Sequence, residues 1–186
     1  MNQPIIQQGD REAPRSVMQL PLVLVLDFLR SAHNVGNIFR IAEATRVEKI
    51  YACGYTPCPP HSKLLKTARG CEQTVPCQSV ADAASALTAL RAAGYTIYGI
   101  ETASNASYYW ETAFRFPAAF VLGNEALGLC ESTLAQCDFF VSLPVLGQKN
   151  SINVGNCAAV VVYEALRQWL DATPGSLNVR TTPQNQ

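Results

Sequence analysis

Three short polar clusters carry most of the chemistry that this sequence could perform. The first is Asn34-Val-Gly-Asn37-Ile-Phe-Arg40, in which two amides and a guanidinium recur every three residues. Residues three or four apart share one face of a helix, and Asn34 can cap that helix. An arginine beside two amides is an arrangement suited to binding phosphate. Taken alone, the heptad also fits a capped helix with a solvated arginine.

The second and third clusters also combine turns with exposed polar groups. The second is GNEALG at 123–128, where two glycines around Glu125 predict a tight turn with open backbone groups; alone, it also fits an ordinary loop. In the third, Ser151, Asn153 and Asn156 stand at the start of a long, mostly apolar segment. Backbone N–H groups at a helix start are open to a ligand, so we expect Ser151 to open a buried helix that caps a binding loop.

Other common catalytic and metal-binding patterns are absent from the sequence. It contains neither a GxGxxG fingerprint nor a Walker loop, which argues against a Rossmann dehydrogenase and a P-loop NTPase. His33 and His61 are the only histidines, and the seven cysteines form no CxxC pair. We therefore expect no metal site, no Ser/His/Asp or Cys/His set, and a reducing, cytoplasmic environment.

Apolar strand-like runs alternate with helix-like segments along the chain. The run Leu22–Phe28, apolar except for Asp27, is typical of a parallel strand that is buried on both faces. This alternation predicts an α/β domain with a mostly parallel sheet flanked by helices, in which ligands bind beyond the carboxyl ends of the strands. We expect strands at 22–28, 49–54, 73–78, 95–101, 118–123 and 137–143, and helices at 34–47, 62–69, 80–93 and 151–170.

Length and composition fit one compact domain. The chain has 186 residues, of which 48% are hydrophobic and 15% charged, and this excludes a disordered protein. The formal net charge is zero, but lysines and arginines exceed acids before residue 70 and acids exceed them after it, which favours an anion-facing first half. We expect a domain at 18–172, flexible segments at 1–17 and 173–186, and no signal peptide or membrane span.

In this order, the three clusters resemble the motifs of the SpoU/TrmH-like family of SPOUT-class RNA ribose methyltransferases. Its first motif, an apolar strand followed by Asn-x-Gly-x-x-x-Arg, matches 22–27 and 34–40. Its second, a strand with Gly-x-Glu-x-x-Gly, matches 121–128. Its third, an aliphatic-Pro strand end and a Ser-x-Asn that opens an Ala-rich helix, matches 143–144 and 151–164. The resemblance spans roughly 20–170, and the ordered triplet is far more specific than any one motif.

The resemblance implies an α/β fold with a C-terminal deep trefoil knot, a homodimer, and S-adenosylmethionine as cofactor. It implies methylation of a ribose 2′-hydroxyl of tRNA, or of rRNA. Arg40 and Asn34 then form the catalytic pair, and because a guanidinium hardly deprotonates, electrostatic positioning is the safer role for Arg40. The implied cofactor-binding residues are Ile100, Thr102, Leu122, Gly123, Glu125, Leu143, Leu146, Ser151 and Asn153.

RNA contact would fall to basic residues of the first half of the chain. The segment 61–69 fits a phosphate-facing helix or a solvated one. Tyr108-Tyr109-Trp110 fits stacking on a flipped base, or a core or dimer contact, and the apolar run Val160–Val162 is a candidate dimer surface. The implied RNA-binding residues are Arg30, Arg40, Lys63, Lys66 and Arg69.

Two other functions compete with RNA methylation. One is a catalytically silent, RNA-binding α/β-knot protein, and the intact Asn34, Arg40, Ser151 and Asn153 argue against it. The other is a nucleotide-binding α/β domain with a small-molecule substrate, which the absence of phosphate-binding fingerprints disfavours.

Overall fold

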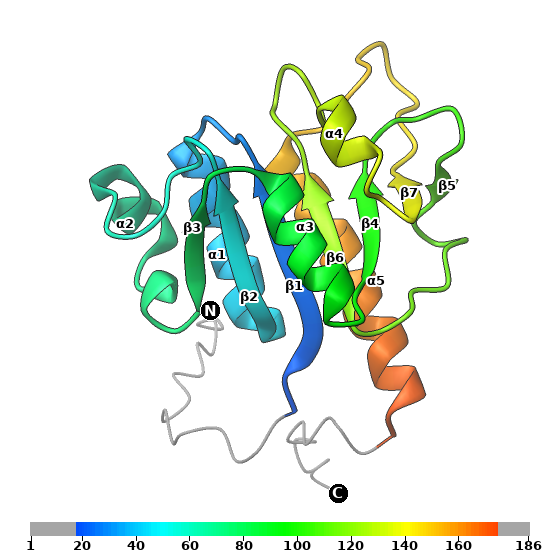
Figure 1. Ribbon diagram of the computed structural model, residues 1–186, viewed down its shortest axis with the longest axis horizontal. Helices are drawn as coiled ribbons and strands as arrows, with labels where there is room; N and C mark the ends of the chain where they lie inside the picture. The colour runs from blue at the N-terminus through cyan, green and yellow to red at the C-terminus, as the bar shows by residue number, and fades with distance from the viewer. Residues whose placement is uncertain (1–17, 175–186) are drawn as a thin grey trace, which may run out of the picture.

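A seven-stranded sheet forms the middle layer of the protein, and each strand pairs in parallel with its neighbours. The computed structural model describes residues 18–174. The arrows of the long strands in Figure 1 point the same way, so their carboxyl ends form one edge of the sheet. The strands lie in the order β3-β2-β1-β6-β4-β7-β5 and comprise β1 (Leu20–Asp27), β2 (Val47–Cys53), β3 (Cys77–Val80), β4 (Thr96–Ile100), β5 (Ser107–Tyr108), β6 (Ala118–Leu122) and β7 (Phe139–Ser142).

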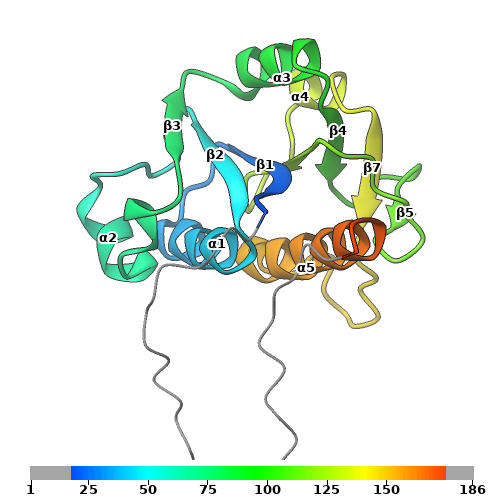
Figure 2. The ribbon, with the colours of Figure 1, turned by 90° about the horizontal axis from the view of Figure 1, so that it is seen from below.

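Helices cover both faces of the sheet, as the view from below shows (Figure 2). The long helices α1 (Ala32–Thr45) and α5 (Val154–Ala172) lie side by side on one face. The helices α3 (Ala83–Ala92) and α4 (Glu131–Leu134) lie on the other. The short helix α2 (Ser62–Ala68) and the 3₁₀ turn η1 (Cys71–Gln73) pack beside α1, next to the β3 edge. The prediction of a mostly parallel sheet between helices is confirmed.

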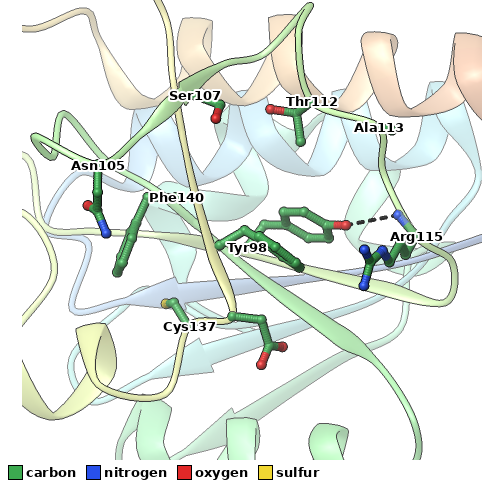
Figure 3. Close-up of a pocket in the computed structure, with 10 residues that line it drawn as sticks. Tyr98, Asn105, Ser107, Thr112, Ala113, Arg115, Cys137 and Phe140 are labelled. Atoms are coloured by element: carbon green, nitrogen blue, oxygen red, sulfur yellow. Dashed lines mark hydrogen bonds between the residues drawn. The ribbon is translucent and has the colours of Figure 1, made fainter.

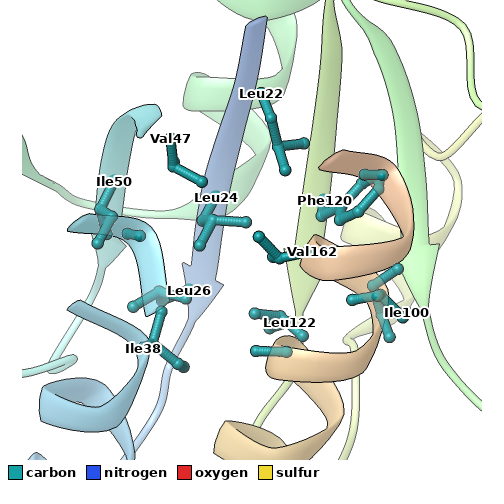
Figure 4. Close-up of a cluster of buried hydrophobic side chains, with 14 of the residues drawn as sticks. Leu22, Leu24, Leu26, Ile38, Val47, Ile50, Ile100, Phe120, Leu122 and Val162 are labelled. Carbon is teal, nitrogen blue, oxygen red and sulfur yellow. The ribbon is translucent and has the colours of Figure 1, made fainter. Parts of the chain in front are cut away.

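The central strand β1 shows why this chain needs an unbroken apolar run. Leu24 and Leu26 point into the cluster beneath α1 and α5, where they meet Ile38 and Val162 (Figure 4). Val25 belongs to the cluster on the α3 face. Since successive side chains of a strand alternate between faces and both faces are covered, every position from Leu22 to Leu26 must be apolar. The buried Asp27 at the end of β1 is the exception.

The register of the central strands brings their carboxyl ends to the same level. Leu26 of β1 pairs with Leu122 of β6, and Leu122 pairs with Ile100 of β4. Ile100 in turn pairs with Val141 of β7. The chain leaves β1 through α1 toward β2 but leaves β6 through α4 toward β7, so connections depart in opposite directions from two adjacent strands. Such a switch point opens a crevice in which doubly wound proteins bind ligands.

Several element boundaries differ from the sequence-based expectation. The strand expected at 73–78 lies at Cys77–Val80, and the helix expected from Val80 begins at Ala83. Val80 belongs to the strand, and Asp82 ends this extended segment as a helix cap, its carboxylate accepting from Ser85 N–H at 2.8 Å. The short elements β5 and α4 carry too few residues for a periodic pattern and were not expected.

The predicted flexible segments, 1–17 and 173–186, lie outside the described residues apart from Thr173 and Pro174. Across residues 18–174, none of the helices has the length and apolar character needed to cross a membrane. The same part of the chain holds no group of three or more histidine, cysteine or acidic side chains placed to bind a metal ion. All seven cysteines are free thiols.

Candidate functional site

A cavity of about 710 Å³ opens at the carboxyl ends of β6, β4 and β7. Its walls come from the strand ends and from the loops that follow them, and its volume lies in the range of small-molecule and cofactor sites. The cavity brings together most of the residues that the sequence assigned to catalysis and to cofactor binding. Those that line it are Asn34, Ile100, Thr102, Leu122, Gly123, Glu125, Leu143, Ser151 and Asn153.

A chain of side-chain hydrogen bonds joins the three sequence clusters at this cavity. The Asn34 amide Nδ2 donates to Glu125 Oε1 at 3.0 Å. The Asn153 amide Nδ2 donates to Asn34 Oδ1, also at 3.0 Å. These contacts join residues 91 and 119 positions apart, so Asn34 is the centre at which the three clusters meet.

Glu125 also fixes the loop between β1 and α1. Its carboxylate accepts hydrogen bonds from Arg30 N–H at 3.0 Å and Ser31 N–H at 3.1 Å, besides that from Asn34. Burial alone would raise the pKa of Glu125, but the hydrogen bonds from Arg30, Asn34 and Ser31 together hold it below its ordinary value. The carboxylate stays ionised at neutral pH, which suits an anchor better than a general base or acid.

Both helices that meet at the cavity start at residues other than those expected: α5 three residues later and α1 two residues earlier. The prediction that Ser151 opens the C-terminal helix is wrong: α5 begins at Val154, and Asn153 caps it by accepting from Gly155 N–H at 2.9 Å. The prediction that Asn34 caps α1 is also wrong, because Ser31 accepts from Asn34 N–H at 3.3 Å. Asn34 therefore lies inside the first turn, and its amide is available to Glu125 and Asn153.

Gly123 lets two backbone segments approach closely in the wall of the cavity. A Cβ atom at this position would lie 2.5 Å from the carbonyl carbon of Gly128 and 2.7 Å from Leu129 N. The turn between them closes with hydrogen bonds between Asn124 and Gly128, and Gly128 adopts a φ of 68°. Both glycines of this motif are thus required by the backbone.

Sequence reasoning did not assign a role to Asn124 or Glu101. The Asn124 side chain accepts from Ala126 N–H at 2.9 Å and donates to Phe28 O at 2.7 Å, which ties the turn to the end of β1. Glu101 lines the cavity directly after β4 and accepts from Leu129 N–H at 3.0 Å. A carboxylate immediately after an apolar strand is the signal that could have revealed Glu101.

Two assigned residues do not line the cavity. Leu146 is 97% exposed in the loop before α5. Arg40 is exposed on α1, whereas Asn34 is buried and Asn37 half-buried. Each three-residue step turns a helix by about 300°, so the series rotates from the interior to the solvent instead of keeping to one face.

The basic residues assigned to RNA lie in and beside the helices of the first half. Arg30, Lys63, Lys66 and Arg69 are exposed, as Arg40 is. Lys63 and Lys66 belong to α2, and Arg69 caps its C-terminal end in the left-handed conformation. These positions leave all of the cations accessible to a polyanion.

The cavity wall contains one thiol, that of Cys157 on α5. Burial, with a smaller contribution from Glu101, raises the pKa of Cys157 to about 11. This thiol is therefore protonated at neutral pH and is a poor nucleophile.

Comparison with known proteins places these features in a family. The family model described as SpoU rRNA Methylase matches residues 21–163. A Staphylococcus haemolyticus protein assigned to the TrmH family of tRNA/rRNA methyltransferases is 32% identical over 164 residues, which are 88% of this chain and 63% of that protein. A relative from Staphylococcus saprophyticus is covered to 60% of its length, so this chain spans less than two thirds of these relatives.

Solved structures resemble the fold over most of the described residues. The SpoU methyltransferase AviRb from Streptomyces viridochromogenes, in complex with the cofactor AdoMet, has a TM-score of 0.73 and 26% identity, with 84% of this chain and 63% of AviRb covered. A structure described as giving insights into the 2-OH methylation of C/U34 on tRNA has a TM-score of 0.71 and 26% identity. That comparison covers 81% of this chain and 97% of the other.

Proposed function

The chain belongs to the SpoU rRNA methylase family, and from this premise we propose that it transfers a methyl group from S-adenosylmethionine to RNA. The proposed acceptor is a ribose 2′-hydroxyl of tRNA, with rRNA as the alternative substrate. The observation that carries the proposal is the hydrogen-bonded centre of Glu125, Asn34 and Asn153, which joins three distant motifs at a cofactor-sized cavity.

The residues of the cavity fit S-adenosylmethionine. Ile100, Leu122 and Leu143 offer apolar walls to an adenine ring, and the Gly123 turn exposes backbone groups. The carboxylate of Glu101 complements a cationic ligand. AviRb, which shares this fold, was solved with AdoMet bound. When bound, the cofactor supplies a methyl group on a positively charged sulfur.

A hydroxyl acceptor suits the groups that the cavity provides. A hydroxyl oxygen can attack a methylsulfonium directly, without a covalent enzyme intermediate, and Cys157 is held as a neutral thiol. The likeness to a protein studied for 2-OH methylation on tRNA, nearly all of which this chain covers, supports the ribose and the tRNA assignments.

We propose that Arg40 contacts the RNA and that Asn34 holds the loops of the acceptor site in place through its hydrogen bonds to Glu125 and Asn153. The Arg40 guanidinium is exposed, so its part is to hold an RNA phosphate or to stabilise charge on the acceptor oxygen. Because Arg40 lies outside the lining of its own cavity, we propose a homodimer in which the partner's α1 supplies this arginine. Of the apolar run Val160–Val162, only Val160 is exposed; with the half-exposed Tyr163, it gives α5 a surface for such a contact.

We also propose that the C-terminal segment forms the trefoil knot of this family. The loop after β7 extends beyond the carboxyl ends of the strands before the chain enters α5, and α5 packs beside α1 (Figures 1 and 2). The overall likeness to two solved structures, with TM-scores of 0.73 and 0.71, supports this proposal.

The decisive experiment compares Arg40→Ala with the wild-type protein. We expect methyl transfer from labelled S-adenosylmethionine to total tRNA to fall by about 100-fold or more, as for loss of an electrostatic catalytic group. Calorimetric titration with S-adenosylhomocysteine should give a nearly unchanged affinity, because Arg40 does not line the cavity of its own chain and the proposed role of the partner's Arg40 is toward the RNA. Nuclease digestion and mass spectrometry of the product should show 2′-O-methylated nucleosides.

Three outcomes would contradict the proposal. A base-methylated product would refute the ribose assignment, and near-normal turnover of Arg40→Ala would refute the role of that arginine. Wild-type protein that binds RNA but transfers no methyl group would support the catalytically silent RNA-binding protein instead.

A further inference from the structure

A second cavity, of about 480 Å³, lies beside the start of β7 (Figure 3). It is enclosed by two stretches of chain, one from the end of β4 to residue 115 and one at 137–140. The residues in its wall combine aromatic rings with amide, hydroxyl and guanidinium groups. They are Tyr98, Asn105, Ser107, Thr112, Ala113, Arg115, Cys137, Asp138, Phe139 and Phe140.

This cavity presents an aromatic surface to the solvent. Phe139 is 40% exposed although its ring stacks on the buried Tyr98, with 5.4 Å between the ring centroids. Tyr108 of β5 and Trp110 of the turn that follows stack on one another, with 4.9 Å between the ring centroids, and both are about half exposed. Aromatic faces that remain accessible are the surfaces on which nucleic-acid bases stack.

The uncompensated charge of the cavity is positive. The guanidinium of Arg115 lies 5.3 Å from the centroid of the Phe139 ring, and among residues 18–174 no carboxylate forms an ion pair with it. Asp138 also lines the cavity, but Arg91 pairs with one of its oxygens at 2.7 Å and Ile97 N–H donates to the other at 2.8 Å. Arg115 is thus the cation available to an anionic ligand.

Polar groups complete the wall. Among the described residues, the side chains of Asn105 and Ser107 have no hydrogen-bond partner, and both are exposed. An amide and a hydroxyl in this state can recognise the edge of a base.

We propose that this second cavity binds a single-stranded nucleotide of the substrate RNA, with its base against Phe139 and its phosphate at Arg115. The RNA identity of the ligand rests on the proposed function. Tyr98 and Phe139 precede Ile100 and Val141 by two residues on the same paired strands, which is about 7 Å along the strands. A nucleotide held here would be a near neighbour of the one presented to the first cavity.

The test measures binding of fluorescein-labelled ten-nucleotide oligouridylate and oligoadenylate by anisotropy, without cofactor. Arg115→Gln removes the phosphate partner, and we expect about fivefold weaker binding and a salt dependence reduced by about 0.7 in slope. Arg46→Gln is the matched control, since it removes the same charge from an exposed residue at the C-terminal cap of α1. Among the described residues, the Arg46 side chain forms no hydrogen bond or ion pair. The affinity of Arg46→Gln for the oligonucleotides should stay within about twofold of that of the wild type.

A second variant, Phe139→Leu, tests the stacking surface. Leucine keeps apolar volume against Tyr98 but removes the ring, so the dissociation constant for both oligonucleotides should rise about fivefold. Binding of S-adenosylhomocysteine should not change, which shows that the variant is folded. Equal oligonucleotide affinity in the wild type, Arg115→Gln and Phe139→Leu would overturn the proposal, as would an absence of binding to the wild type.

Two further comparisons identify the ligand. Adenosine monophosphate should bind more weakly than the oligonucleotides; tighter binding of the free nucleotide would overturn an RNA subsite. Protein that methylates RNA yet binds the oligonucleotides equally well in all variants would refute this subsite and leave the proposed function intact. Protein without methyl transfer whose RNA binding still depends on Arg115 would refute the proposed function and keep the RNA subsite.

Discussion

The two cavities share the strands β4 and β7 but are built in different ways. At the first cavity, side chains 91 and 119 residues apart join through Asn34, and backbone N–H groups anchor the carboxylate of Glu125. The second cavity is formed by only two stretches of chain, and its wall mixes the rings of Tyr98, Phe139 and Phe140 with polar side chains. Among the polar contacts in its wall, Arg115 N–H donates to the hydroxyl of Tyr98 at 2.9 Å.

This difference has a physical consequence for substitutions. Backbone groups and glycines set the shape of the first cavity, so a small change there should move several loops at once. Rings and a guanidinium set the shape of the second, where one side chain can change while the strands stay in place. The difference predicts large, coupled effects at the first cavity and small, local effects at the second.

Gly123→Ala should have the largest effect. The added Cβ would lie 2.5 Å from the backbone of Gly128, and backbone cannot rotate away as a flexible side chain can. We expect a loss of about 3 kcal/mol in the free energy of unfolding and no measurable binding of S-adenosylhomocysteine. Urea denaturation and calorimetric titration would measure the two effects.

Gly147→Ala is the control for Gly123→Ala. Gly147 lies in the loop before α5, and a Cβ there would meet no atom within 4 Å. The stability of Gly147→Ala and its affinity for S-adenosylhomocysteine should match those of the wild type. If Gly123→Ala behaved like this control, the backbone would not determine the shape of the first cavity.

Glu125→Gln should have the next largest effect. The glutamine amide places a donor where the carboxylate accepts from Arg30 N–H, Ser31 N–H and Asn34. We expect a loss of about 1.5 kcal/mol at pH 7 and weaker binding of S-adenosylhomocysteine, because the loop before α1 loses its anchor.

The difference in stability between the wild type and Glu125→Gln should also depend on pH. Since the folded protein holds the pKa of Glu125 below the ordinary 4.5, the stabilisation is complete above about pH 5 and is lost as the pH falls toward 3. Glutamine does not titrate, so the stability difference between the two proteins should shrink over this range. A difference that stayed constant from pH 6 to pH 3 would mean that the charge of Glu125 contributes nothing.

The first cavity could be predicted from the sequence to a large extent because its essential parts are motifs. Leu22–Phe28 predicted the central strand, and the positions of Asn34, Gly123 and Asn153 after strands placed them at one edge of the sheet. Contacts between these residues depend on tertiary packing, however. The sequence therefore did not reveal that Asn34 bridges Glu125 and Asn153, or that Asn153 rather than Ser151 caps α5.

The second cavity left almost no trace in the sequence. Phe139 occupies an ordinary apolar position of a strand, and β5, with only two residues, has no detectable period. The sequence indicates a stacking surface at Tyr108-Tyr109-Trp110, but nothing in the sequence around Arg115 distinguishes this arginine from one that is merely solvated. Stacking of Tyr98 on Phe139 follows from the pairing of β4 with β7, which a local pattern does not specify.

Tyr98→Phe should have the smallest effect and tests the independence of the two cavities. The substitution removes the acceptor of Arg115 N–H and keeps the ring, whose contacts with Phe114, Phe120 and Phe139 have centroid distances of 5.1, 5.8 and 5.4 Å. We expect a loss of about 1 kcal/mol in the free energy of unfolding. The Tyr108 hydroxyl in β5 has no hydrogen-bond partner among the described residues, so Tyr108→Phe should change the free energy of unfolding by less than about 0.5 kcal/mol.

The pH dependence and the ligand affinity of Tyr98→Phe should separate it from Glu125→Gln. Burial raises the pKa of Tyr98 above its ordinary value, so the hydroxyl stays protonated and the loss should be constant between about pH 6 and pH 9. Tyr98 does not line the first cavity, so the affinity for S-adenosylhomocysteine should not change. A variant with weakened S-adenosylhomocysteine binding would show instead that the two cavities are coupled through β4.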